Sequence, residues 1–221
     1  MAIATYADLV TEAQDYFFGR PDIAAKVPTF VRLFEAKANR ALRCRQMEIR
    51  ASASTNPAST SPEFLSLPSD YQSMRRLRLL NPSDVARGTP SLDFVVPAQL
   101  DMFRERDNTP ADPSHFTVFG TELELYPTPL ATVTYNFEMI YRANIPPLDG
   151  VVNTTNWLLT LAPDTYLYGT LLEASPWLLG DERIPVWASA VKDAFDGLNL
   201  LSDDATYNAG PLIIRRRKGG Y

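Results

Sequence analysis

The chain has 221 residues and a formal net charge of −5, with 45% hydrophobic and 21% charged residues, which is the composition of a folded globular protein and excludes a disordered chain. No run approaches the roughly 18 apolar residues of a membrane helix, and the acidic charge argues against general attraction to DNA phosphates. With one cysteine, Cys44, and one histidine, His115, the chain cannot form an internal disulfide and has few ligands for zinc.

Two amphipathic helices are predicted within the first 50 residues. Thr5 followed by Asp8 is typical of a helix cap, and apolar residues then recur on one face until Gly19 and Pro21 end the helix. The second helix begins near Pro28, and its apolar face lies opposite a basic one. That basic face carries Arg32, Arg40 and Arg43.

A β region is predicted next. Residues 51–62 are rich in Ser, Thr, Pro and Asn and lack periodicity, so we expect an irregular entry into this region. Gly120 and Thr121 predict a hairpin turn, residues 97–106 predict a short helix, and Tyr135, Phe137 and Tyr141 alternate with polar residues as in a half-buried strand. The predicted strands are 64–67, 74–80, 115–119, 122–126 and 131–142.

Beyond Pro147 the apolar period is helical again. A stripe from Leu167 to Leu178 predicts one helix, and Asp181 is expected to cap the next, whose apolar face includes Trp187. Because amphipathic helices bury their apolar faces, we expect an α+β fold in which the N- and C-terminal helices form a four-helix bundle with the antiparallel β region inserted. The predicted domains are bundle helices 1–50, β region 51–146, bundle helices 147–207 and an extended C-terminal tail 208–221.

Motifs for catalysis are not found in the sequence. His115 would have to serve any Ser-His-Asp hydrolase, and it has no nucleophile motif near it. The sequence also lacks a phosphate-binding glycine loop, a dinucleotide fingerprint and spaced metal ligands. We therefore expect no enzyme activity, no cofactor and no metal.

Charge is unevenly distributed along the chain. Eight basic residues lie between Arg20 and Arg50 against three acidic ones, whereas six acidic residues lie between Asp181 and Asp204 against two basic ones. This asymmetry favours ordered contacts between neighbouring subunits. The candidate subunit-interface residues are Arg32, Arg40, Arg43, Asp203 and Asp204.

The C-terminal segment joins three apolar residues to four consecutive positive charges. A terminal basic run is often a solvated tail, but an apolar trio at a free end lowers solubility unless it docks onto a partner. The predicted partner-docking residues are Leu212, Ile213, Ile214, Arg215, Arg216, Arg217 and Lys218.

Several strings resemble the head-to-tail adaptor proteins of tailed double-stranded DNA phages: TYADLVTEAQDYF at 5–17, LPSDY at 67–71, HFTVFGTELELYP at 115–127 and TNWLLTLAPDTYLYGTLLEASPWLLGDERIPVW at 155–187. The resemblance implies a structural virion protein, assembled in the host cytoplasm, that forms a ring of twelve copies between portal and tail. Such a ring surrounds the DNA exit channel without reading DNA sequence, sends a C-terminal extension towards the portal protein, and offers docking surface to the tail nozzle or tail fibres. It implies no catalytic motif and no membrane.

Two other functions remain open from the sequence. A carbohydrate-binding or fibre-like β module would expose the aromatic residues Tyr135, Phe137 and Tyr141 on a concave face. Another neck, tail-tube or head-completion protein would share most features of the adaptor interpretation.

Overall fold

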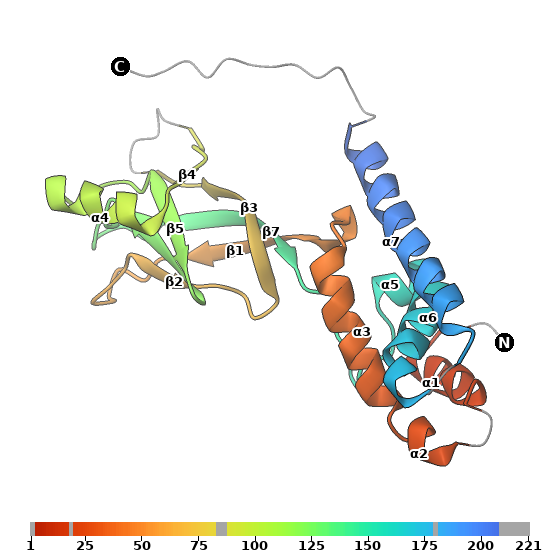
Figure 1. Cartoon of the computed structure of the whole chain (residues 1–221). Helices are drawn as coiled ribbons and strands as arrows, with labels where there is room; N and C mark the ends of the chain where they lie inside the picture. Colours follow the sequence, from red (N-terminus) through yellow and green to blue (C-terminus); the bar gives the residue numbers. More distant parts are fainter. Residues whose placement is uncertain (1–2, 18–19, 83–87, 179–180, 208–221) are drawn as a thin grey trace. The chain divides into compact units, whose positions relative to one another are not determined.

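The computed structural model describes residues 3–17, 20–82, 88–178 and 181–207. The chain forms two compact units, coloured along the sequence in Figure 1. The helical unit consists of Met1–Met47 and Ile145–Tyr221, and the β unit consists of Glu48–Asn144. The tail predicted for 208–221, including its docking residues, lies outside the described residues.

The helical unit is organised around one central helix, α6. This helix contacts α1, α3, α5 and α7, and Figure 1 shows it between α3 and α7. Among the described residues, no helix has the length and apolar character needed to cross a membrane. The helices are α1 (Tyr6–Asp15), α2 (Pro21–Ala24), α3 (Val27–Ala41), α5 (Trp157–Leu161), α6 (Pro163–Glu173) and α7 (Ile184–Tyr207), with 3-10 turns at η1 (Arg45–Met47) and η3 (Ser175–Trp177).

The start of α1 confirms the predicted cap. The Thr5 hydroxyl accepts the backbone N–H of Asp8 at 3.3 Å, and the Asp8 carboxylate accepts the backbone N–H of Thr5 at 3.0 Å. The Thr5 hydroxyl also donates to the Asp8 carboxylate at 2.9 Å, and this bond, together with the one from the Thr5 backbone N–H, lowers the pKa of Asp8. The cap predicted at Asp181 is not at the start of a helix, because α7 begins at Ile184. The Asp181 carboxylate instead accepts the backbone N–H of Arg183 at 2.9 Å in the turn that precedes α7.

The predicted four-helix bundle is wrong, and the fold is a mixed α+β structure without one. A bundle needs helices of similar length that each bury one stripe. Here α6 buries residues on most of its sides, from Thr165 to Leu171, so it forms the centre of the unit. The stripe predicted to continue to Leu178 is interrupted, because Pro176 cannot continue an α-helix and the chain turns into η3.

The β unit contains two sheets. One has the strand order β1-β7-β3, and the other has the order β2-β6-β5-β4, in which β4 runs parallel to β5 and the other pairs are antiparallel. A helix, α4 (Pro97–Arg106), coincides with the predicted one and contacts β5. The strands are β1 (Glu48–Ser54), β2 (Phe64–Ser66), β3 (Tyr71–Leu79), β4 (Asp93–Phe94), β5 (His115–Phe119), β6 (Glu122–Tyr126) and β7 (Asn136–Ala143).

A shared apolar core joins the two sheets. On β7, Phe137, Met139 and Tyr141 are buried and alternate with more accessible residues, as predicted from their spacing. Leu77 of β3 and Leu123 of β6 belong to the same core. The predicted hairpin is also present, because β5 and β6 pair up to Phe119 and Glu122 and Gly120 has a φ of +61°.

Two strands were not predicted, β1 and the short β4. β1 begins at Glu48, within the range predicted as bundle helices, and continues to Ser54, within the segment expected to be irregular. It pairs with β7 along its whole length, from Glu48 opposite Arg142 to Ser54 opposite Asn136. Alanine and serine have weak strand propensity, and they form a strand here because the neighbouring β7 supplies hydrogen-bond partners. The start of β7 is later than predicted, at Asn136.

Candidate interaction surfaces

The interior of the β unit does not provide the exposed aromatic platform of a carbohydrate-binding module. Tyr135 and Phe137 are fully buried, and Tyr141 is 3% exposed. The Tyr135 hydroxyl donates to the Asp112 carboxylate at 2.7 Å, and the Tyr141 hydroxyl donates to Asp70 at 3.0 Å. Burial and the Asp70 carboxylate raise the pKa of Tyr141 to about 12. These aromatic residues hold the core together, which removes the feature that favoured the carbohydrate interpretation.

His115 lies half-buried at the start of β5. Its Nδ1 is 2.8 Å from the hydroxyl of its neighbour Ser114, and its ring packs against Phe103 of α4 at 5.4 Å and Tyr126 of β6 at 6.3 Å. The ring therefore forms part of the contact between α4 and the sheet. In the part of the chain that the structure describes, no group of three or more His, Cys, Asp or Glu side chains is placed to hold a metal ion.

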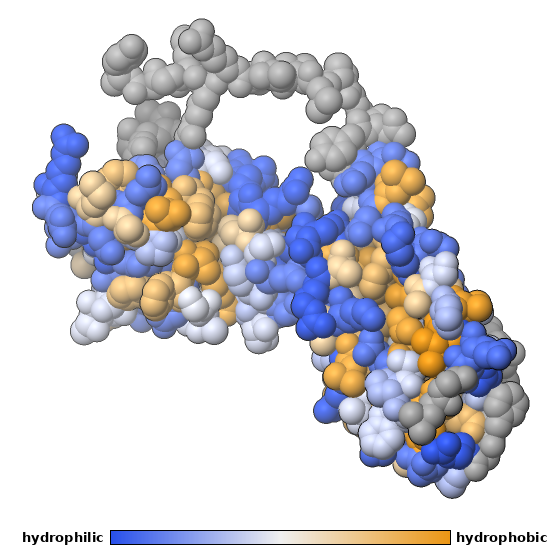
Figure 2. Space-filling view, viewed as in Figure 1, coloured by the Kyte–Doolittle hydropathy of each residue, from blue (hydrophilic) through white to orange (hydrophobic). Residues whose placement is uncertain are grey.

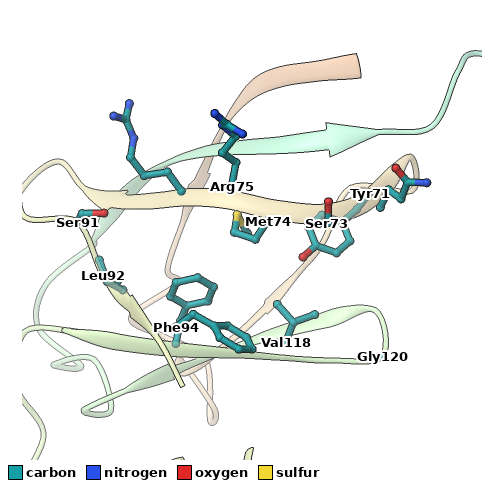
Figure 3. Close-up of a pocket in the computed structure, with 12 residues that line it drawn as sticks. Tyr71, Ser73, Met74, Arg75, Ser91, Leu92, Phe94, Val118 and Gly120 are labelled. Carbon is teal, nitrogen blue, oxygen red and sulfur yellow. The ribbon is translucent and has the colours of Figure 1, made fainter. Parts of the chain in front are cut away.

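A cavity of about 670 Å³ lies where β3 faces the edge of the other sheet. Figure 3 shows Met74, Leu92, Phe94 and Val118 around this cavity, whereas Arg75 extends to the other side of β3. The Arg75 guanidinium forms an ion pair with Glu48 at 3.1 Å. The lining is mixed, because Gln72, Ser73 and Ser91 lie beside these apolar side chains, and Phe94 is 59% exposed.

The predicted basic face of α3 is present. Arg32 and Arg40 are exposed on α3, and Arg43 is exposed just beyond its end. The Arg43 backbone N–H donates to the Asn199 side chain on α7 at 2.8 Å, and its guanidinium donates to the Leu42 carbonyl at 3.0 Å. The end of α3 is therefore fixed beside the C-terminal part of α7.

The predicted acidic residues Asp203 and Asp204 are exposed near the end of α7. The backbone N–H of Arg45 donates to the Ser202 hydroxyl at 2.7 Å, so the segment after α3 runs close to them. Arg43, Asp203 and Asp204 thus share one end of the helical unit. Arg32 lies about two turns of helix earlier on α3 than Arg40.

A buried polar network, which no sequence pattern predicted, connects α3 and α6. The same oxygen of Glu35 accepts the backbone N–H of Leu148 at 2.9 Å and the hydroxyl of Tyr166 at 3.1 Å. The Asn156 side-chain amide donates to that hydroxyl at 2.6 Å and to the Pro146 carbonyl at 2.9 Å. Burial raises the pKa of Glu35. The network connects α3 and α6 to the segment that follows the β unit. In the sequence, the only indication of it is Glu35, an acidic residue on the apolar side of α3.

A second cluster of hydrogen bonds stabilises the turn at Asp149. One Asp149 oxygen accepts the backbone N–H groups of Val151, Val152 and Asn153, each at 2.9 Å, and these bonds lower the pKa of Asp149. Gly150 has a φ of +74°, and a Cβ there would lie 2.8 Å from the Tyr6 ring. The turn holds Val151 and Val152 at 84% and 80% exposure.

Comparison with known proteins adds one finding. A family model described as SU10 adaptor protein matches residues 4–215. No curated protein matches the chain.

Proposed function

The chain belongs to the SU10 adaptor protein family, and from this premise we propose that it is the head-to-tail adaptor that joins a phage portal to the tail. As a phage adaptor it is a structural protein of the virion neck and associates with other virion components. The observation that carries the proposal is the extent of the match, which runs from residue 4 to residue 215 and so includes both units.

In this proposal, twelve copies form a ring around the path of the exiting DNA. Twelve copies at −5 each would carry a charge of −60. A channel of the same sign as the DNA phosphates repels them, so DNA slides through without sequence-specific binding. Assembly in the host cytoplasm and docking of a tail nozzle or tail fibres belong to the same proposal.

The C-terminal tail is proposed to bind the portal. Leu212, Ile213 and Ile214 would fill an apolar groove, and the following charges, Arg215 to Lys218, would meet acidic residues beside it. Equivalent tails acting on one portal ring raise the effective concentration of each contact, so individually weak contacts give firm attachment.

Electron microscopy of purified particles tests the location. Particles that carry a small tag on this chain should show tag density in a ring between portal and tail. Density along the tail tube or within the capsid would overturn the proposal and would favour a tail-tube or head-completion protein.

Deletion of residues 212–221 tests the tail. The shortened chain should keep the melting temperature of the full chain and lose binding to purified portal rings, because the deleted residues follow the last described helix. A matched variant that replaces Arg215 to Lys218 with serine and keeps the apolar trio separates charge from apolar contact. Full portal binding by the deletion variant would contradict this part of the proposal.

A further inference from the structure

Two rows of side chains on the helical unit have the same spacing and opposite charge. On α3 the row is Arg32, Ala36 and Arg40, and on α7 it is Asp196, Leu200 and Asp204. Residues four positions apart lie one above the other on a helix, so each row is a ridge along its helix. At 1.5 Å per residue, the two charges that end each ridge are about 12 Å apart on both helices.

Both ridges lie at the centre of a helix face that points away from the core. On α3, Phe34 and Ala38 are fully buried, and on α7, Phe195 and Leu198 are each 8% exposed. The Phe34 and Phe195 rings stack at 6.0 Å, so the buried faces of the two helices meet. The ridges are on the opposite faces and therefore cannot meet each other within one chain.

The charges of these ridges are available for a partner. Among the described residues, Arg32, Arg40 and Asp204 form no ion pair, and Asp196 forms a pair with Lys192 at 3.6 Å in which both side chains are more than two thirds exposed. An exposed pair of this kind contributes little stability. Leu200, in the middle of its ridge, is 62% exposed, and Figure 2 shows apolar surface over the upper part of α7.

We propose that the α3 ridge of one copy packs against the α7 ridge of the next copy; this rests on the proposed adaptor ring. Ala36 leaves room for Leu200 at the centre, and an arginine meets an aspartate at each end. Because the central residue is midway between its two charges, the match holds for parallel and for antiparallel helices. Two different surfaces joined head to tail generate a closed ring when the rotation between copies closes.

The exposed neighbours of the two ridges extend the contact. Leu33, 49% exposed, lies beside the α3 ridge, and Leu201, 65% exposed, lies beside the α7 ridge. Apolar side chains that flank paired charges exclude water from them, which strengthens the electrostatic attraction. The contact therefore combines apolar area with charge complementarity.

Cysteine cross-linking tests the contact in the full-length chain. Ala36→Cys, Leu200→Cys and the double variant are treated with a short bismaleimide, both in assembled particles and at high protein concentration without the portal. Unsubstituted protein is the control, since its Cys44 is 1% exposed. The double variant should give a ladder of covalent oligomers, each single variant should stay monomeric, and a mixture of the two single variants should give dimers.

Each other result overturns the inference. A dimer from Leu200→Cys or Ala36→Cys by itself would show a twofold contact between identical faces. If the double variant gives no covalent product either in particles or in solution, the ridges do not meet. A cross-link between either cysteine and the portal would show that the ridge binds the portal instead.

Charge reversal gives a second readout. Arg32→Glu with Arg40→Glu should reduce the cross-linked yield about tenfold or more, because like charges then face each other. Adding Asp196→Arg with Asp204→Arg should restore it, since both ridges are reversed. Asp101→Arg with Glu105→Arg, two exposed acids on α4, is the matched control and should leave the yield unchanged. Failure of the second pair to rescue the first contradicts the pairing.

The two proposals fail in different ways. If tagged protein is in the neck but the double cysteine variant gives no ladder, the adaptor role stands and the interface is wrong. If the protein is absent from the neck, the adaptor role is wrong, and the mixture of single cysteine variants in solution still decides whether the ridges meet.

Discussion

Gly169 on α6 provides a quantitative test of how the helical unit is packed. A Cβ at this position would overlap the Phe34 ring and lie 2.8 Å from its Cγ. That ring is fully buried, packs edge-on against Tyr166 at a centroid distance of 5.2 Å and stacks on Phe195 at 6.0 Å. Because the ring is held on two sides, it cannot move aside without displacing other core residues.

The expected effect of Gly169→Ala follows from two opposing contributions. Overpacking of a filled core costs about 3 kcal/mol. Replacing a glycine inside a helix by alanine returns about 1 kcal/mol. The net loss in the free energy of unfolding is therefore about 2 kcal/mol, which corresponds to a melting temperature lower by about 4–8 °C.

Urea unfolding followed by the helical circular dichroism signal measures this change. Gly197→Ala on α7 is the matched control, because no atom lies within 4 Å of a Cβ placed there, and it should stabilise the protein by up to about 1 kcal/mol. Adding Phe34→Leu to Gly169→Ala should recover part of the loss as a favourable coupling energy. If Gly169→Ala were as stabilising as Gly197→Ala, the close approach of α6 and α3 would be refuted.

Three further predictions follow from burial and charge. Trp187→Ala should lower the free energy of unfolding by about 3–5 kcal/mol, because Trp187 is 3% exposed and its removal leaves a cavity. Trp177→Ala should lower it less, because Trp177 is 46% exposed. Equal losses for the two variants, measured by urea unfolding, would place Trp187 outside the core. Burial raises the pKa of Glu35, so the native state binds the proton of this carboxyl more tightly than the unfolded state does. The stability of the wild-type protein should therefore fall as the pH rises from the ordinary carboxyl pKa through the raised one. Glu35→Gln keeps the acceptor for Leu148 and Tyr166 and should lack this loss, so a stability difference between variant and wild type that did not change with pH would contradict the argument. The full-length chain should be monomeric in light scattering at micromolar concentration without a portal, because exposed ion pairs bind weakly, and a stable ring under those conditions would count against this.

Local patterns in the sequence determined several elements correctly. The Thr5 and Asp8 cap, helix α4 and the hairpin at Gly120 depend on hydrogen bonds or dihedral angles within a few residues, so the sequence contains their cause. The buried faces of β7 and of α7 around Trp187 were also predicted, because periodicity records which side of an element meets the core. The exposure of Arg32 and Arg40 followed from the same periodicity.

Tertiary structure decided what local patterns could not. β1 forms because β7 lies beside it, and the two strands are separated by more than eighty residues of sequence. The central place of α6 depends on Gly169 meeting Phe34 of α3, and the buried Glu35 is accommodated because Leu148 and Tyr166 supply donors from distant segments. For the ridges, the sequence contained the common spacing, but burial of the opposite faces of α3 and α7 in one unit was needed to show that both point outward. Contacts between distant segments depend on the whole packed chain, so a single helix or strand pattern does not determine them.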